Sequence, residues 1–107
     1  MIKVTVFKKD NLFVGLKSVG HAGYADKGQD IVCSAASVLL INTVNSIETL
    51  TKDEISYKNI SSGDLEVFFP KGLSDAGDLL MNSLILGLNE IKNEYGEAYF
   101  TLSVKEV

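Results

Sequence analysis

Short stretches of this chain alternate apolar and polar residues, and two longer stretches carry apolar residues three and four positions apart. Alternation is typical of a strand with one buried face, and the longer spacing is typical of an amphipathic helix. The pattern therefore predicts strands over residues 2–7, 12–19, 54–60, 65–69 and 98–105, and helices over about 30–50 and 74–95. The predicted element order is ββαββαβ.

Residues that favour turns and helix ends lie between these stretches. KKDN at 8–11 and SSGD at 61–64 predict tight turns that make two hairpins. Asp30 is a good N-cap for the first helix, because its carboxylate can accept hydrogen bonds from the first backbone amides. Ser74 opens the second helix and Gly96 fits its C-terminal end.

Alternating strands indicate a sheet with one face on the core and the other in water, so both helices most simply cover the same face. The expected fold class is α+β. It is a two-layer sandwich with two helices on one face of a mainly antiparallel sheet. At 107 residues the chain has the size of one domain, and residues 1–107 are expected to form a single one.

The charge composition restricts the partners. The net charge is −4 and all ten basic residues are lysines, so the chain lacks arginine, on which base readout depends heavily. We therefore expect no direct binding of nucleic acid. A basic protein or peptide would be easier to attract.

The chain shows no sign of export. Its N-terminus lacks the pattern of a signal peptide, and a lone cysteine cannot form an intramolecular disulfide. The longest continuous apolar stretch, around 38–41, is far shorter than the roughly 20 residues of a membrane span. We expect a cytoplasmic protein with no membrane partner.

The candidate chemistry lies in residues 20–37, which hold the sole histidine, His21, and the sole cysteine, Cys33. Imidazole and thiol could meet if the segment between them folds back over the strand end, which is the minimal equipment for covalent cysteine catalysis. Cys33 would be about the third residue of the predicted helix, where unpaired amides and the helix dipole favour a thiolate. The backbone amides of Cys33 and its neighbour are candidate oxyanion donors. The intervening loop carries Gly20, Gly23 and Gly28.

Each of these residues also has a structural interpretation. Cys33 could be a small buried hydrophobe, and His21 a strand-end histidine with a satisfied hydrogen bond. Asp30 could cap the helix or orient the imidazole, and Ser37, one turn beyond the cysteine, could line a cleft or permit close packing. A zinc site would need Asp26 and Asp30 to complete its ligands, so no metal is expected.

The run G-H-A at 20–22, followed by G-x-D-I-V-C-S-A-A-S at 28–37, resembles the signature of the ribosomal-processing cysteine protease family, Prp. The resemblance extends over essentially the whole chain. It implies a cytoplasmic, cofactor-free endopeptidase that removes a short N-terminal extension from a large-subunit ribosomal protein. It also implies that Cys33 is the nucleophile and His21 its general base and acid.

The resemblance further implies a homodimer, and a mobile glycine-rich loop over the active site in which Gly20, Gly23 and Gly28 would adjoin the substrate. The alternative is a non-enzymatic protein of ribosome association or assembly. In that case Cys33 would serve only in packing.

Overall fold

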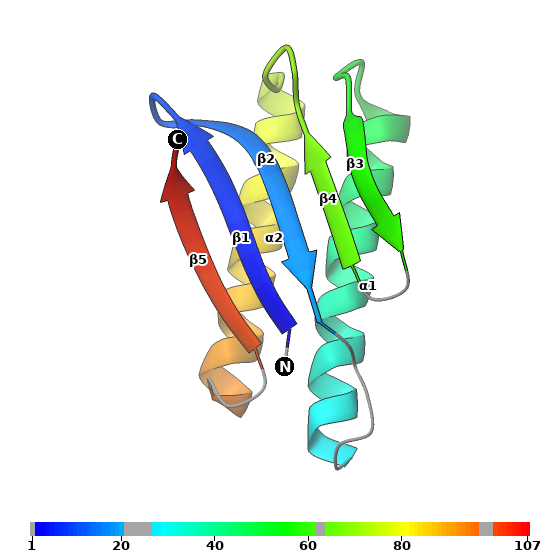
Figure 1. The fold of residues 1–107 in the computed structure, drawn as a ribbon, viewed down its shortest axis with the longest axis vertical. Coiled ribbons are helices and arrows are strands. Elements are labelled where there is room, and N and C mark those ends of the chain that lie inside the picture. Colours follow the sequence, from blue (N-terminus) through cyan, green and yellow to red (C-terminus); the bar gives the residue numbers. More distant parts are fainter. Residues whose placement is uncertain (1, 21–26, 62–63, 97–99) are drawn as a thin grey trace.

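The computed structural model describes residues 2–20, 27–61, 64–96 and 100–107, and these form two layers (Figure 1). In the described residues two helices cover one face of a five-stranded sheet with strand order β3-β4-β2-β1-β5. The predicted fold class and the element order ββαββαβ are confirmed. The elements are β1 (Ile2–Lys9), β2 (Leu12–Val19), α1 (Lys27–Leu50), β3 (Ser56–Ser61), β4 (Asp64–Phe68), α2 (Asp75–Tyr95) and β5 (Phe100–Glu106).

The sheet is mainly antiparallel, as predicted. Antiparallel pairing joins β1 to β2, β2 to β4 and β3 to β4, and the one parallel pair in the described sheet joins β1 to β5. Asp10 and Asn11 form the tight turn between β1 and β2, with φ of 51° and 68°. Aspartate and asparagine are among the residues that tolerate such backbone angles best, which is why this short loop can close the hairpin.

Capping was predicted correctly for α2 and wrongly for α1. Ser74 is the N-cap of α2, where its Oγ accepts a hydrogen bond from the Gly77 amide, and Gly96 ends the helix with φ 84°. Helix α1 begins at Lys27, so Asp30 is its fourth residue and not its N-cap. The apolar periodicity starts only at Ile31, and the polar first turn of the helix carries no such signal.

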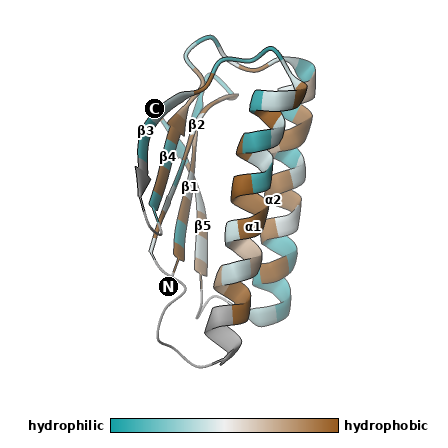
Figure 2. Cartoon of the chain, turned by 90° about the vertical axis from the view of Figure 1, so that its right-hand side faces the viewer, coloured by the Kyte–Doolittle hydropathy of each residue, from teal (hydrophilic) through white to brown (hydrophobic). Residues whose placement is uncertain are grey.

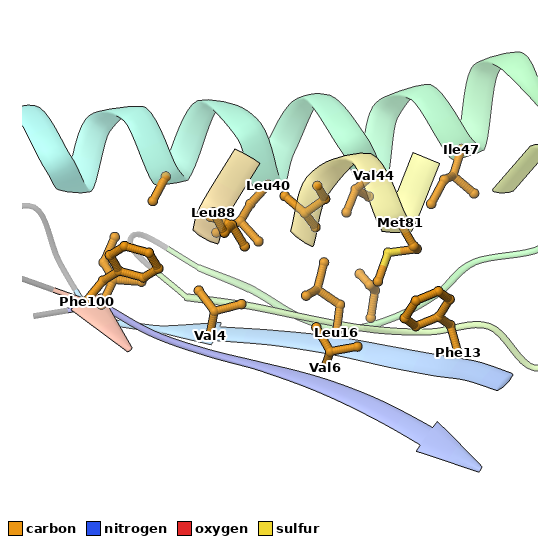
Figure 3. Packing of buried hydrophobic residues seen from close by; sticks show 14 of the residues in the cluster. Val4, Val6, Phe13, Leu16, Leu40, Val44, Ile47, Met81, Leu88 and Phe100 are labelled. Atoms are coloured by element: carbon orange, nitrogen blue, oxygen red, sulfur yellow. The ribbon is translucent and has the colours of Figure 1, made fainter. Parts of the chain in front are cut away.

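A cluster of buried apolar side chains joins the two layers. Figure 2 shows both helices on the same side of the sheet. Figure 3 shows the side chains that meet between the helices and the sheet. This packing is the expected outcome of alternating strands and amphipathic helices. The labelled members are Val4, Val6, Phe13, Leu16, Leu40, Val44, Ile47, Met81, Leu88 and Phe100.

Asp53, in the segment after α1, holds the start of α2. Its carboxylate accepts hydrogen bonds from the backbone amide of Ser74 at 2.9 Å and from the Ser74 hydroxyl at 2.8 Å. The approach is so close that a Cβ built on Gly77 would overlap Asp53 Oδ2. A glycine at this position of α2 therefore leaves room for the carboxylate.

A similar contact ties the edge strand β3 to α1. The Tyr57 hydroxyl donates a hydrogen bond to the Glu48 carboxylate at 2.5 Å. Burial of the phenol, together with this negatively charged partner, raises the pKa of Tyr57 to about 12. The hydroxyl therefore stays protonated, and can keep donating to Glu48, to a higher pH than an ordinary tyrosine with a pKa of 10.0.

Helix α1 is more apolar than the short continuous run at 38–41 indicated. Within the described residues, the segment Ile31–Leu50 is long and apolar enough to cross a membrane by length and composition alone. No charged residue lies between 31 and 47. One side of the helix packs on the sheet, whereas Ile31, Val38 and Ile41 are exposed. A mostly buried core helix of a soluble protein and a signal sequence meet the same criterion, so length and composition alone do not assign α1 to a membrane.

Candidate active site

Cys33 lies on the side of α1 that faces the sheet. Its relative exposure is 0%, and it belongs to the same buried cluster as Val32, Ala36 and Phe100. It is the seventh residue of α1, because the helix begins at Lys27. The thiol therefore lies inside the apolar cluster that joins the two layers.

This position corrects the prediction that Cys33 lies in the first helical turn. Unpaired amides belong to the first four residues of a helix, and the effect of the dipole fades within the first turn. The seventh residue is beyond both. The helix start therefore does not supply the stabilisation of a thiolate that the sequence suggested, and the Cys33 amide lies within the helix rather than at its unpaired end.

The other predicted site residues are distributed between the end of β2 and α1. Gly20 directly follows β2 and has φ 115°, a backbone angle that favours glycine. Gly28 is the second residue of α1, so it belongs to the helix and not to the loop. Ser37 is half-buried, one turn after the cysteine. His21, Gly23 and Asp26 lie outside the described residues.

One contact at this site joins parts of the chain that are distant in sequence. The backbone amide of Gly20 donates a hydrogen bond to the carboxylate Oδ1 of Asp64, the first residue of β4, at 3.1 Å. Sequence reasoning assigned Asp64 only to a turn. Its proximity to Gly20 depends on β4 lying beside β2, and no local pattern reveals that neighbour.

Burial of Cys33 leads to a direct prediction about its reactivity. Iodoacetamide should alkylate native Cys33 roughly 100-fold or more slowly than Cys33 in the urea-unfolded chain, because a buried sulfur must first be uncovered by local opening. The measurement is the labelled fraction against time by mass spectrometry, at one pH for both states. Rates within about twofold of each other would show that reagents reach the sulfur without such opening.

Comparison with known proteins defines the class of this site. A family model described as Cysteine protease Prp matches residues 1–100. With its sole cysteine on the helix that packs against the sheet, the chain is thus a cysteine protease. More specifically, it belongs to the Prp family.

Two relatives in this family carry the name Ribosomal processing cysteine protease Prp. The one from Staphylococcus aureus is 32% identical over 80 residues, which cover 73% of this chain and 74% of the relative. The one from Bacillus subtilis is 28% identical over 101 residues, which cover 89% of this chain and 90% of the relative. The predicted family membership is confirmed, and with it the prediction of an enzyme.

Solved structures agree with the fold. The Staphylococcus aureus Prp protease in complex with a covalently linked product peptide matches 98% of this chain with a TM-score of 0.85 and 28% identity, over 100% of its own length. Its complex with a substrate peptide matches with a TM-score of 0.87 and 27% identity, again over 98% of this chain and 100% of its own. These matches favour the protease over the alternative of a non-enzymatic assembly protein.

Proposed function

We propose that this protein is a cytoplasmic endopeptidase that removes a short N-terminal extension from a large-subunit ribosomal protein, with Cys33 as nucleophile and His21 as general base and acid. The observation that carries the proposal is the match of residues 1–100 to a cysteine protease family in a chain with one cysteine. A cysteine protease needs a cysteine nucleophile, and Cys33 is the sole candidate. His21 is the sole imidazole.

The proposed reaction has two covalent steps. The Cys33 sulfur attacks the carbonyl carbon of the scissile peptide bond while His21 takes the thiol proton. The C–N bond then breaks, the imidazolium gives its proton to the leaving amine, and a thioester remains. Water, activated by the neutral imidazole, hydrolyses the thioester and restores the thiol. The covalently linked product peptide of the Staphylococcus aureus protease supports chemistry of this type.

The buried thiol sets a requirement for this reaction. A sulfur with 0% exposure cannot reach a peptide carbonyl, so side chains around Cys33 must move apart when substrate binds. We propose that the substrate extension drives this opening with its own binding energy, as substrate-induced rearrangement does in many enzymes. The net charge of −4 favours the approach of a basic ribosomal protein.

The test is a cleavage assay with the large-subunit ribosomal protein that carries its N-terminal extension. Mass spectrometry should detect a new N-terminus after incubation with this protein, and none after incubation with Cys33→Ala. The same ribosomal protein without the extension is the matched control and should stay intact. An extended substrate that also stays intact with the unmodified protein would contradict the proposed function.

We also propose that the protein is a homodimer, and that the two copies meet through the side of the helical layer that faces away from the sheet. We call this side the outer helix face and define it by Ile31, Val38, Leu79 and Leu86, which are 57%, 66%, 69% and 62% exposed. The two residues on each helix are seven positions apart, so they lie on one side of it. Helices α1 and α2 lie side by side, since a Cβ on Gly87 would be 3.0 Å from Leu39 Cδ1.

The charge distribution supports this surface as the contact. Helix α1 has no charged residue at 31–47, and α2 has none at 79–89. Interface centres are depleted of charged residues, so this uncharged surface suits a contact between two copies. Two copies with a net charge of −4 each repel one another, and an uncharged contact keeps their carboxylates away from the centre.

Leu86→Glu should dissociate this dimer, because it places an unpaired carboxylate in the proposed contact. We expect the dimer dissociation constant to rise by about 100-fold or more, measured by sedimentation. Leu12→Glu is the matched control, since Leu12 is 64% exposed but lies at the start of β2. If the unmodified protein sediments at 11.6 kDa at micromolar concentration, or Leu86→Glu stays dimeric, the proposed interface is wrong.

A further inference from the structure

The end of β2 is fixed by a side chain from β4. Backbone pairing between the two strands is antiparallel, and its last described pair toward Gly20 is Ser18 with Leu65. Two residues beyond Ser18, the Gly20 amide donates to Asp64 Oδ1 at 3.1 Å in a partly buried position. The carboxylate thus extends the connection between the strands past the end of their backbone pairing.

Gly20 needs such an anchor more than other residues would. Glycine has the widest choice of backbone angles, and here it adopts φ 115°, which other residues rarely do. A hydrogen bond to its amide therefore removes freedom from the chain immediately before position 21. Catalytic groups must be held within about 0.5 Å of their productive geometry, so freedom at the preceding residue matters for catalysis.

We infer that Asp64 is a positioning residue for catalysis: its carboxylate holds the Gly20 peptide and so fixes the point from which His21 departs. This inference rests on the proposed function, in which His21 is the general base. In this role Asp64 does not act on the reacting atoms directly. It acts through Gly20.

Backbone pairing holds the hairpin of β3 and β4 together without the Asp64 side chain. The positioning role of Asp64 can therefore be separated from a purely structural one. Asp64 pairs with Ser61 across the hairpin through the backbone, and Leu65 pairs with both Ile60 and Ser18. These pairings use main-chain atoms, so they persist when the side chain of Asp64 is replaced. The carboxylate can therefore be altered with the strand in place.

Three variants test the inference. Asp64→Ala removes the hydrogen-bond acceptor, and Asp64→Asn keeps an Oδ1 acceptor without the charge. Glu66→Ala is the control, because it removes a carboxylate two residues along the same side of β4, opposite Lys17. With the extended ribosomal protein as substrate, we expect Asp64→Ala to lower kcat about tenfold and to leave KM within about twofold, since a misplaced base affects the chemical step more than binding. Asp64→Asn should retain at least about half of kcat, because its Oδ1 can still accept the Gly20 hydrogen bond, and Glu66→Ala should match the unmodified protein.

Hydrogen exchange of the Gly20 amide gives a second readout that needs no substrate. Exchange should be about tenfold faster in Asp64→Ala and close to normal in Asp64→Asn and Glu66→Ala. Normal kcat in Asp64→Ala, or an Asn variant as impaired as the Ala variant, would overturn the positioning role. Unchanged exchange in Asp64→Ala would overturn the anchor itself. Absence of cleavage by the unmodified protein would instead refute the proposed function, and with it the catalytic part of this inference. The exchange data would still decide whether Asp64 holds Gly20.

Discussion

Cys33→Ala should lose cleavage activity by about 1,000-fold or more and still fold, because it removes the proposed nucleophile on which both covalent steps would depend. Alanine suits this position. Cys33 is fully buried among small neighbours on α1, including Ala36, and the loss of one sulfur should cost only about 1 kcal/mol of stability. The measurements are the rate of cleavage by mass spectrometry and the midpoint of thermal unfolding.

Cys33→Ser should be nearly inactive as well. A hydroxyl is a poorer nucleophile, and a buried hydroxyl must also find a hydrogen-bond partner. Ser34→Ala is the matched control, since Ser34 is the next residue along the helix and is exposed. Substantial cleavage by a preparation of Cys33→Ala that contains no unmodified protein would exclude Cys33 as the nucleophile.

Gly77→Ala should destabilise the protein by about 2 kcal/mol, the size of a lost hydrogen bond to a charged group. An alanine in a helix is usually more stable than a glycine by about 1 kcal/mol, so the expected sign is the reverse of the normal one. The reason is that the new methyl group would overlap Asp53 Oδ2 and displace the carboxylate from Ser74. Chemical denaturation measures the difference in the free energy of unfolding.

A double-mutant cycle isolates this cause. In an Asp53→Ala background the carboxylate is gone, and the nearest remaining atoms are Leu73 Cδ2 at 3.2 Å and Leu73 Cβ at 3.3 Å. These contacts are tight but far less so than the overlap with Oδ2, so Gly77→Ala should then be within about 1 kcal/mol of neutral. Gly87→Ala is a second control, because its Cβ would meet only the terminal methyl of Leu39 at 3.0 Å, which can shift slightly. If Gly77→Ala costs the same with and without Asp53, the overlap with the carboxylate does not explain it.

The sequence was most informative where a structural feature depends on residues that are close together in the sequence. Alternation predicted the strands, and Ser74 and Gly96 marked the ends of α2 because each satisfies backbone groups of its own helix. The prediction that Asp30 caps α1 was wrong because it, too, relied on local residue type. A cap residue is recognised by its type, but aspartate is also accepted within a first turn, and the true start at Lys27 lacks an apolar pattern.

The sequence predicted which residue types form the candidate site, but not how buried they are or which residues lie beside them. His21 and Cys33 are recognisable because each is the sole member of its kind and falls in a family motif. Burial of the thiol follows from how α1 packs on the sheet, and the contact between Gly20 and Asp64 spans 44 positions. Neither fact is encoded in a local pattern, since both depend on which strands become neighbours.

The parallel pairing of β1 with β5 has a consequence for biosynthesis. Ile2 pairs with Phe100 and Lys8 pairs with Glu106, so β1 needs a partner strand that the ribosome makes only after α1, β3, β4 and α2. During translation β1 can pair with β2, but its other edge stays open until β5 has emerged. Pairing between such distant segments is slow, and open edges invite association with other chains. A nascent chain of this protein therefore acquires its complete sheet, and the core that surrounds the thiol, only after synthesis has passed β5.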